Sequence, residues 1–117
     1  MIKLFLILEI LVFAGASLFH FGVLVKGFEH QKARVAESII GLILLIGLCV
    51  GLISPGQMRT AGLIVQGIAL FGTFIGVFTI IAGVGPRSVP DFIFHACMIA
   101  LLITGLIVTN SMQFNID

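Results

Sequence analysis

The sequence predicts an all-α fold, a four-helix transmembrane bundle of up-down topology that forms a single transmembrane domain over residues 1–117. Of the 117 residues, 60% are hydrophobic and 9% are charged, whereas soluble domains carry about 25% charged residues. The mean hydropathy is +1.30, and a small domain in water could not bury so much apolar surface. The apolar residues also fall into four segments, each close to the length of about 20 residues that crosses a bilayer.

The first predicted span covers residues 4–25. This region also has features of a signal peptide, namely a lysine, an apolar run and the pattern Ala14-x-Ala16. We expect a span instead, because Glu9 interrupts the apolar run and the hydrophobic stretch continues to Val25.

The remaining spans are predicted at residues 35–53, 61–84 and 89–108. The links "KGFEHQKAR", "SPGQMRT" and "GVGPRSVPD" separate the spans. They are charged or rich in glycine and proline, which interrupt regular structure. The links are too short for a second domain, and they favour antiparallel neighbouring helices.

The distribution of lysine and arginine predicts the orientation, because basic residues in short flanks stay cytoplasmic. Four basic residues lie on the side of the first and third links, against two on the other side. This excess predicts both termini outside. The net charge of +1 without a charged run suggests no nucleic acid. The four are Lys26, Lys32, Arg34 and Arg87, and the two are Lys3 and Arg59.

Glycines occur at the spacing that lets helices pack closely in lipid. Gly47 and Gly51 form one GxxxG motif, Gly72 and Gly76 form another, and Gly83 follows Gly72 by about three turns. The spacing favours packing between helices of this chain, and packing against a partner chain stays a second possibility. The two cysteines lie inside apolar segments, where a thiol behaves as a small hydrophobe.

Five ionisable residues fall within or at the edges of the spans, where each costs about 2.5–3.5 kcal/mol by insertion scales. Asp91 has a structural explanation, since "SVPD" fits a capping box in which Ser88 begins a helix. Glu37 lies three residues after Arg34, which allows an ion pair near the headgroups. A functional role for Glu37 stays equally open. The five are Glu9, His20, Glu37, Asp91 and His95.

His20 and His95 are expected at one depth, since His20 lies five residues before Val25 and His95 six after Val89. Both would then lie roughly 8–9 Å below the same membrane face. Three hypotheses stay open for the pair. The first is that the histidines are structural and hydrogen-bonded. The second is that they bind a haem, a chlorophyll-type ring or a metal ion, and the third is that they take part in proton-coupled binding or transport.

Glu9 lies 11 residues before His20, close to three turns, so the two share one stripe of the first helix with Phe13 and Ala16. We expect this stripe to face the bundle interior. A proton path along it is one hypothesis, and a simple hydrogen-bond partner is the other. The candidate partners are Gln66, Thr73, Thr79 and Thr104.

Two segments, "VAESIIGLILLIGL" and "ALFGTFIGVFTIIAGVGPRSVPDFIFHACMIALLITGL", resemble small four-span prokaryotic integral membrane proteins. Those proteins carry a glutamate early in the second span, a glycine-proline-basic turn and a histidine early in the fourth. The resemblance covers about half of the chain. It implies the four-helix layout and a prokaryotic cell membrane, but no activity. The residues that match are Glu37, Gly85, Pro86, Arg87 and His95.

Small multidrug transporters have a similar length, four spans and a first-helix glutamate, and Glu9 lies in the corresponding span. Their glutamate is surrounded by tyrosine and tryptophan, and this chain has neither. The similarity is therefore one of size.

The leading functional prediction is a non-catalytic subunit of a membrane complex or a self-associating bundle, with lipid and other membrane subunits as partners. One alternative is a proton-coupled transporter of small solutes that uses Glu9 and Glu37. The other is an electron-transfer or pigment subunit that holds haem, pigment or a metal through His20 and His95. The sequence has no nucleophile-and-base motif and no P-loop, so we expect no enzyme.

Overall fold

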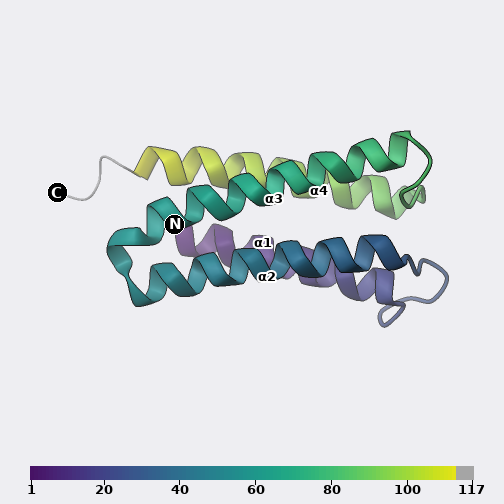
Figure 1. The fold of residues 1–117 in the computed structure, drawn as a ribbon, viewed down its shortest axis with the longest axis horizontal. Helices are drawn as coiled ribbons and strands as arrows, with labels where there is room; N and C mark the ends of the chain where they lie inside the picture. The colour runs from purple at the N-terminus through teal and green to yellow at the C-terminus, as the bar shows by residue number, and fades with distance from the viewer. Residues whose placement is uncertain (113–117) are drawn as a thin grey trace.

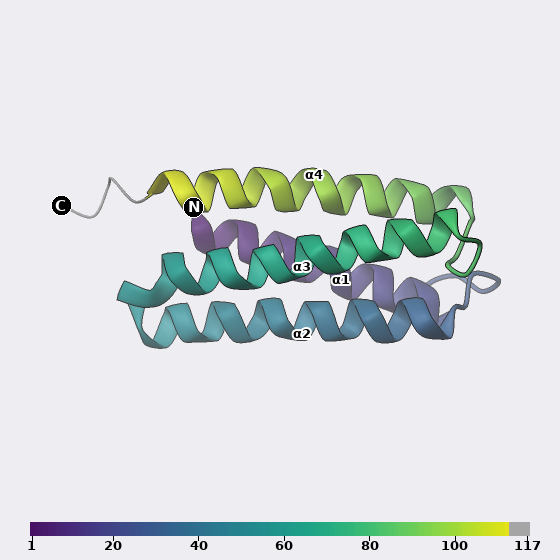
Figure 2. The ribbon, with the colours of Figure 1, turned by 45° about the horizontal axis from the view of Figure 1, so that its top comes forward.

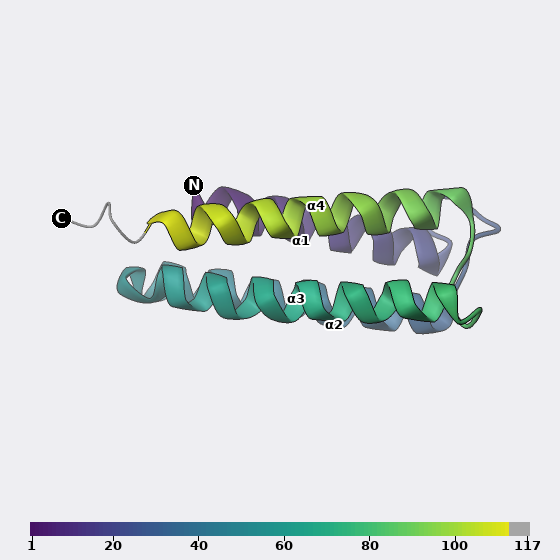
Figure 3. The ribbon, with the colours of Figure 1, turned by 90° about the horizontal axis from the view of Figure 1, so that it is seen from above.

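The computed structural model describes residues 1–112 and has the predicted all-α architecture. The four helices run up and down along one axis and form a bundle (Figure 1). Figure 3 shows that α1 and α4 lie in one layer and α2 and α3 in the other. The helices are α1 (Ile2–Phe21), α2 (Gln31–Ile53), α3 (Met58–Ile81) and α4 (Val89–Ser111), and the short 3-10 helix η1 (Pro55–Gln57) precedes α3.

The two ends of the bundle differ. The α1–α2 and α3–α4 links lie together at one end, which we call the loop end (Figure 2). The N-terminus, η1 and the end of α4 lie at the other, the terminal end. Since α1 contacts both α2 and α4, side chains from three helices can meet at the loop end.

The helices have the dimensions and surface of membrane spans. All four are long and apolar enough to cross a membrane, and their 20 to 24 residues extend about 30–36 Å. That length matches a hydrocarbon core of about 30 Å. Large apolar side chains such as Phe71, Phe78 and Ile107 point outward, while Leu44 and Leu102 are fully buried. We therefore treat the chain as a membrane protein.

Two helices end earlier than predicted. Helix α1 ends at Phe21 rather than near Val25, because Gly22 adopts a left-handed conformation (φ 79°) and its N–H bonds to the carbonyl of Phe19. Helix α3 ends at Ile81 rather than Val84.

The earlier end of α3 corrects the interpretation of Gly83. We expected Gly83 to continue the packing stripe of Gly72, but it lies beyond α3 in a left-handed conformation (φ 83°). Its role is to turn the chain at the loop end, which glycine does without steric cost.

The other four glycines contact helices of this chain. An added Cβ at Gly47 would lie 2.5 Å from Val65, and one at Gly51 would lie 2.5 Å from Met58. At both positions α2 and α3 pack closely against each other, in the half of the bundle toward the terminal end. Gly72 faces Ile40 of α2, and Gly76 faces His95 of α4.

Candidate functional site

A buried histidine lies between two carboxylates at the loop end. His20 Nδ1 is 2.7 Å from Glu37 Oε2, and His20 Nε2 is 2.5 Å from Asp91 Oδ1. The exposed fractions are 0% for His20, 6% for Glu37 and 2% for Asp91. The three residues come from α1, α2 and α4, so the triad joins three helices.

The local backbone fixes where the triad forms. Gly22 ends α1 two residues after His20, and the His20 carbonyl accepts the N–H of His30 at 3.0 Å. This backbone hydrogen bond therefore holds the end of the α1–α2 link next to His20. On α2, Glu37 lies in the second turn after the N-cap residue His30, which accepts the N–H of Ala33.

The predicted capping box of α4 is confirmed, and it also orients the triad. Asp91 Oδ2 accepts the backbone N–H and the hydroxyl of Ser88, and Ser88 Oγ accepts the N–H of Asp91. Because Oδ2 is occupied by the cap, Oδ1 is left for His20. Asp91 therefore both begins the helix and belongs to the site, two roles that the sequence had presented as alternatives.

The hydrogen bonds of the triad set its charge in the state without a third proton. Each ring nitrogen of His20 faces a carboxylate oxygen, so each of the two contacts needs one bridging proton. Two carboxylates (−2) and an imidazolium (+1) give a net charge of −1, and moving a bridging proton to a carboxylate leaves this sum unchanged. Among residues 1–112, Glu37 Oε1 is the triad oxygen that has no hydrogen-bond donor.

Two expectations about these residues were wrong. The Arg34 guanidinium lies 4.9 Å from the centre of the Phe21 ring, while Glu37 turns inward to His20. The matched depth of the two histidines also fails, because α1 ends right after His20. His20 meets Asp91 in the first turn of α4, whereas His95 lies one turn further into the bundle.

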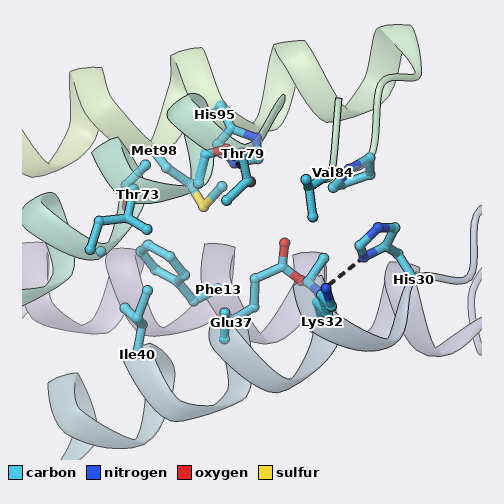
Figure 4. A pocket seen from close by; sticks show the side chains of 17 residues that line it. Phe13, His30, Lys32, Glu37, Ile40, Thr73, Thr79, Val84, His95 and Met98 are labelled. Carbon is cyan, nitrogen blue, oxygen red and sulfur yellow. Dashed lines mark hydrogen bonds between the residues drawn. The ribbon is translucent and has the colours of Figure 1, made fainter. Parts of the chain in front are cut away.

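A cavity of about 190 Å³ adjoins the triad between α2 and α3. Glu37 reaches into it from α2, with His95 and Thr79 on the opposite side (Figure 4). Phe13 and Met98 lie at its inner end, toward the middle of the bundle. Most of the lining is apolar, and its polar residues are His30, Lys32, Glu37, Thr73, Thr79 and His95.

His95 is half-buried and bonded to its own helix. Its Nδ1 lies 2.8 Å from the carbonyl oxygen of Asp91, one turn earlier. An added Cβ at Gly76 would lie 2.9 Å from His95 Nε2, so the absence of a side chain there makes room for the ring.

Glu9 belongs to a second buried cluster toward the terminal end. Gln66 Nε2 donates to Glu9 Oε1 at 2.9 Å and to Oε2 at 3.2 Å, and Gln66 Oε1 accepts the hydroxyl of Thr109 at 2.9 Å. All three residues are fully buried. Glu9 and His20 thus both face the interior, as their stripe predicted, and Gln66 is the candidate partner that Glu9 takes.

The other candidate partners bond within their own helices. Thr73, Thr79 and Thr104 donate to the carbonyls of Ala69, Gly76 and Ala100, respectively. Such bonds to the preceding turn are the usual way for a hydroxyl to be satisfied inside an apolar helix.

The geometry of His20 does not favour the hypothesis that its ring ligates a haem or a metal ion. A ligating nitrogen needs a free lone pair, and both nitrogens of His20 are engaged with carboxylates at 2.7 and 2.5 Å. Within residues 1–112, no three His, Cys, Asp or Glu side chains are grouped so that they could hold a metal ion. His20 and His95 meet different atoms of Asp91 rather than one shared ligand.

The sequence identified all three triad residues but did not connect them. The missing signal was the helix end at Gly22, which brings His20 level with the first turn of α4. The cavity was also missed, because its lining comes from all four helices and the α3–α4 link, whose relative placement the sequence does not give.

Comparison of the chain with protein-family models, with curated proteins and with solved structures found no match in any of the three. The function is therefore argued from the triad and its cavity.

Proposed function

We propose that this membrane protein binds a small organic cation in the loop-end cavity, in exchange for a proton on Glu37. One observation carries the proposal: Glu37 Oε1 has no donor within the described chain, lies on a residue that lines the cavity, and belongs to a buried cluster whose charge is −1 when that oxygen is unprotonated. The sequence prediction of a proton-coupled transporter named two carboxylates, Glu9 and Glu37. The present proposal keeps Glu37 as the group that exchanges the proton.

The electrostatic reason is that an uncompensated buried charge is unfavourable in a low-dielectric interior. The net −1 of the triad is neutralised either by a third proton or by a cation beside Glu37 Oε1. Both occupy the same oxygen, so binding one displaces the other. The titratable groups around Glu37 are His20 on α1, the N-cap residue His30, Lys32 on α2, and Asp91 and His95 on α4.

The cavity sets the size and character of the ligand. An apolar cavity of about 150 Å³ in another protein holds benzene, and this one is about 190 Å³. Ile40, Ile75 and Met98 line it with apolar surface. Glu37 supplies a negative charge, and the basic residue Lys32 lies on the side of the lining toward His30 (Figure 4). A ring or short hydrocarbon with one ammonium group fits this combination, as is common for sites with a few placed polar groups.

Glu9 has no part in this exchange. It lies in the separate cluster with Gln66, and it does not line the cavity. The GxxxG glycines each have a contact within this chain, so their spacing does not require a partner chain. The triad and cavity therefore favour ligand binding over the subunit role.

The test is to add phenyltrimethylammonium to purified, weakly buffered protein in detergent that contains a pH indicator. This cation carries no exchangeable proton, so any released proton comes from the protein. We expect saturable binding with release of up to one proton per chain, both lost in Glu37→Gln.

Glu29→Gln is the matched control, because Glu29 is an exposed loop carboxylate at the same end and bonds the N–H of Gly27. It should bind like the wild type. An absence of binding, or equal binding and proton release by Glu37→Gln, would refute the proposal.

A further inference from the structure

We propose that His95 makes the cavity select primary ammonium ions over quaternary ones. This inference rests on the proposed function and specifies the ligand class of the same site. It begins with the hydrogen bond of the ring, in which Nδ1 lies 2.8 Å from the carbonyl oxygen of Asp91.

That hydrogen bond fixes the tautomer of His95. A carbonyl oxygen can only accept, so Nδ1 must carry the proton. In the neutral ring, Nε2 then has no hydrogen and presents a lone pair. No group in residues 1–112 donates to Nε2.

His95 Nε2 lies beside Gly76, which has no side chain to cover it, and both residues line the cavity. A methyl group there would lie 2.9 Å from Nε2 and would push the ring aside. His95 lies on the side of the cavity opposite Glu37 (Figure 4). One ligand in a cavity of about 190 Å³ can therefore meet both residues.

The other polar groups of the inner cavity are acceptors as well. Thr73 and Thr79 give their hydroxyl protons to Ala69 and Gly76 at 2.7 Å each, so lone pairs face the remaining space. With Glu37 Oε1 and His95 Nε2, the lining offers acceptors from three helices. A ligand with several N–H donors on one cationic group satisfies this pattern, and a primary ammonium has three.

A quaternary ammonium has the charge but no donor. It gains the attraction of Glu37 and covers His95 Nε2 without a hydrogen bond, which leaves a desolvated acceptor unpaired. The two cation types thus differ in the hydrogen bonds that they can donate, and variants of His95 then measure the share of that residue.

The experiment is a calorimetric titration of the wild type and variants with benzylammonium and with phenyltrimethylammonium. In the wild type, we expect benzylammonium to bind at least about tenfold more tightly, as for a hydrogen bond with a charged donor. His95→Phe keeps an aromatic ring but lacks the acceptor. It should reduce this preference several-fold, because one of the acceptors is lost, and leave phenyltrimethylammonium affinity within about twofold, the scatter of neutral contacts.

Two further variants keep the test decisive if His95→Phe folds poorly. His95→Gln places an amide oxygen near the former Nε2, so it should restore part of the preference. Gly76→Ala leaves His95 unchanged but crowds its ring, so it should weaken benzylammonium more than phenyltrimethylammonium.

The outcomes separate the two proposals. If phenyltrimethylammonium binds in a Glu37-dependent way but His95→Phe weakens both cations equally, or the wild type shows no preference, the role of His95 is refuted and the proposed function stands. If neither cation binds the wild type, the proposed function fails and the role of His95 fails with it.

Discussion

Replacing His20 with leucine should destabilise the protein more than any other single substitution at the loop end. The ring makes hydrogen bonds of 2.7 and 2.5 Å to Glu37 and Asp91, and all three residues are buried. Leucine fills a similar volume and removes both donors. The substitution leaves two buried carboxylates facing each other without the cation between them.

The expected loss follows from these contacts. A hydrogen bond to a charged group contributes about 1.5–3 kcal/mol, and breaking a buried ion pair by removing one partner costs about 3–5 kcal/mol. The histidine serves two such contacts, but the remaining carboxylates can share a proton. We therefore expect the free energy of unfolding to fall by about 3–5 kcal/mol. The assay is an SDS titration in dodecyl maltoside micelles, with the folded fraction measured by pulse proteolysis.

The matched control is His30→Leu at the same end. That ring accepts the N–H of Ala33 as the N-cap of α2, a contact that contributes about 1 kcal/mol. Adding Glu37→Leu to His20→Leu should recover part of the loss, because one stranded carboxylate is removed. A loss for His20→Leu no larger than that for His30→Leu would refute the reasoning that the triad holds three helices together.

Three further substitutions test other parts of the fold, each by the same SDS titration. Gly47→Ala should lose about 1–3 kcal/mol by overpacking, because its Cβ would lie 2.5 Å from Val65; wild-type stability would contradict the described α2–α3 contact. Gly22→Ala should lose about 1–2 kcal/mol, because residue 22 has φ 79°; no loss would show that α1 does not end there. Gln66→Leu should lose about 3 kcal/mol or more by stranding the buried Glu9, whereas Gln66→Glu, which can share a proton with Glu9, should lose less.

Features that depend on one segment were predictable from the sequence. The four spans follow from apolar length, and the Ser88 cap follows from a four-residue pattern. The interior position of Glu9 and His20 follows from a spacing of three turns on one helix.

Features that depend on the rotation and relative height of several helices were not predictable. The triad needs α1 to end at Gly22, so that His20 reaches Glu37 and Asp91 rather than the level of His95. A shift of the α1 end by four residues, from Val25 to Phe21, changes the partner of His20. For the same reason, Arg34 looked like the partner of Glu37 when only their spacing was considered.

The central claim is that the proton on Glu37 and a bound cation replace each other, and difference infrared spectroscopy tests it most directly. Adding phenyltrimethylammonium to the wild type should remove one protonated-carboxyl band and increase the carboxylate bands, with no such change in Glu37→Gln. A bound cation without any change in the carboxyl bands, or the same change in Glu37→Gln, would contradict the account.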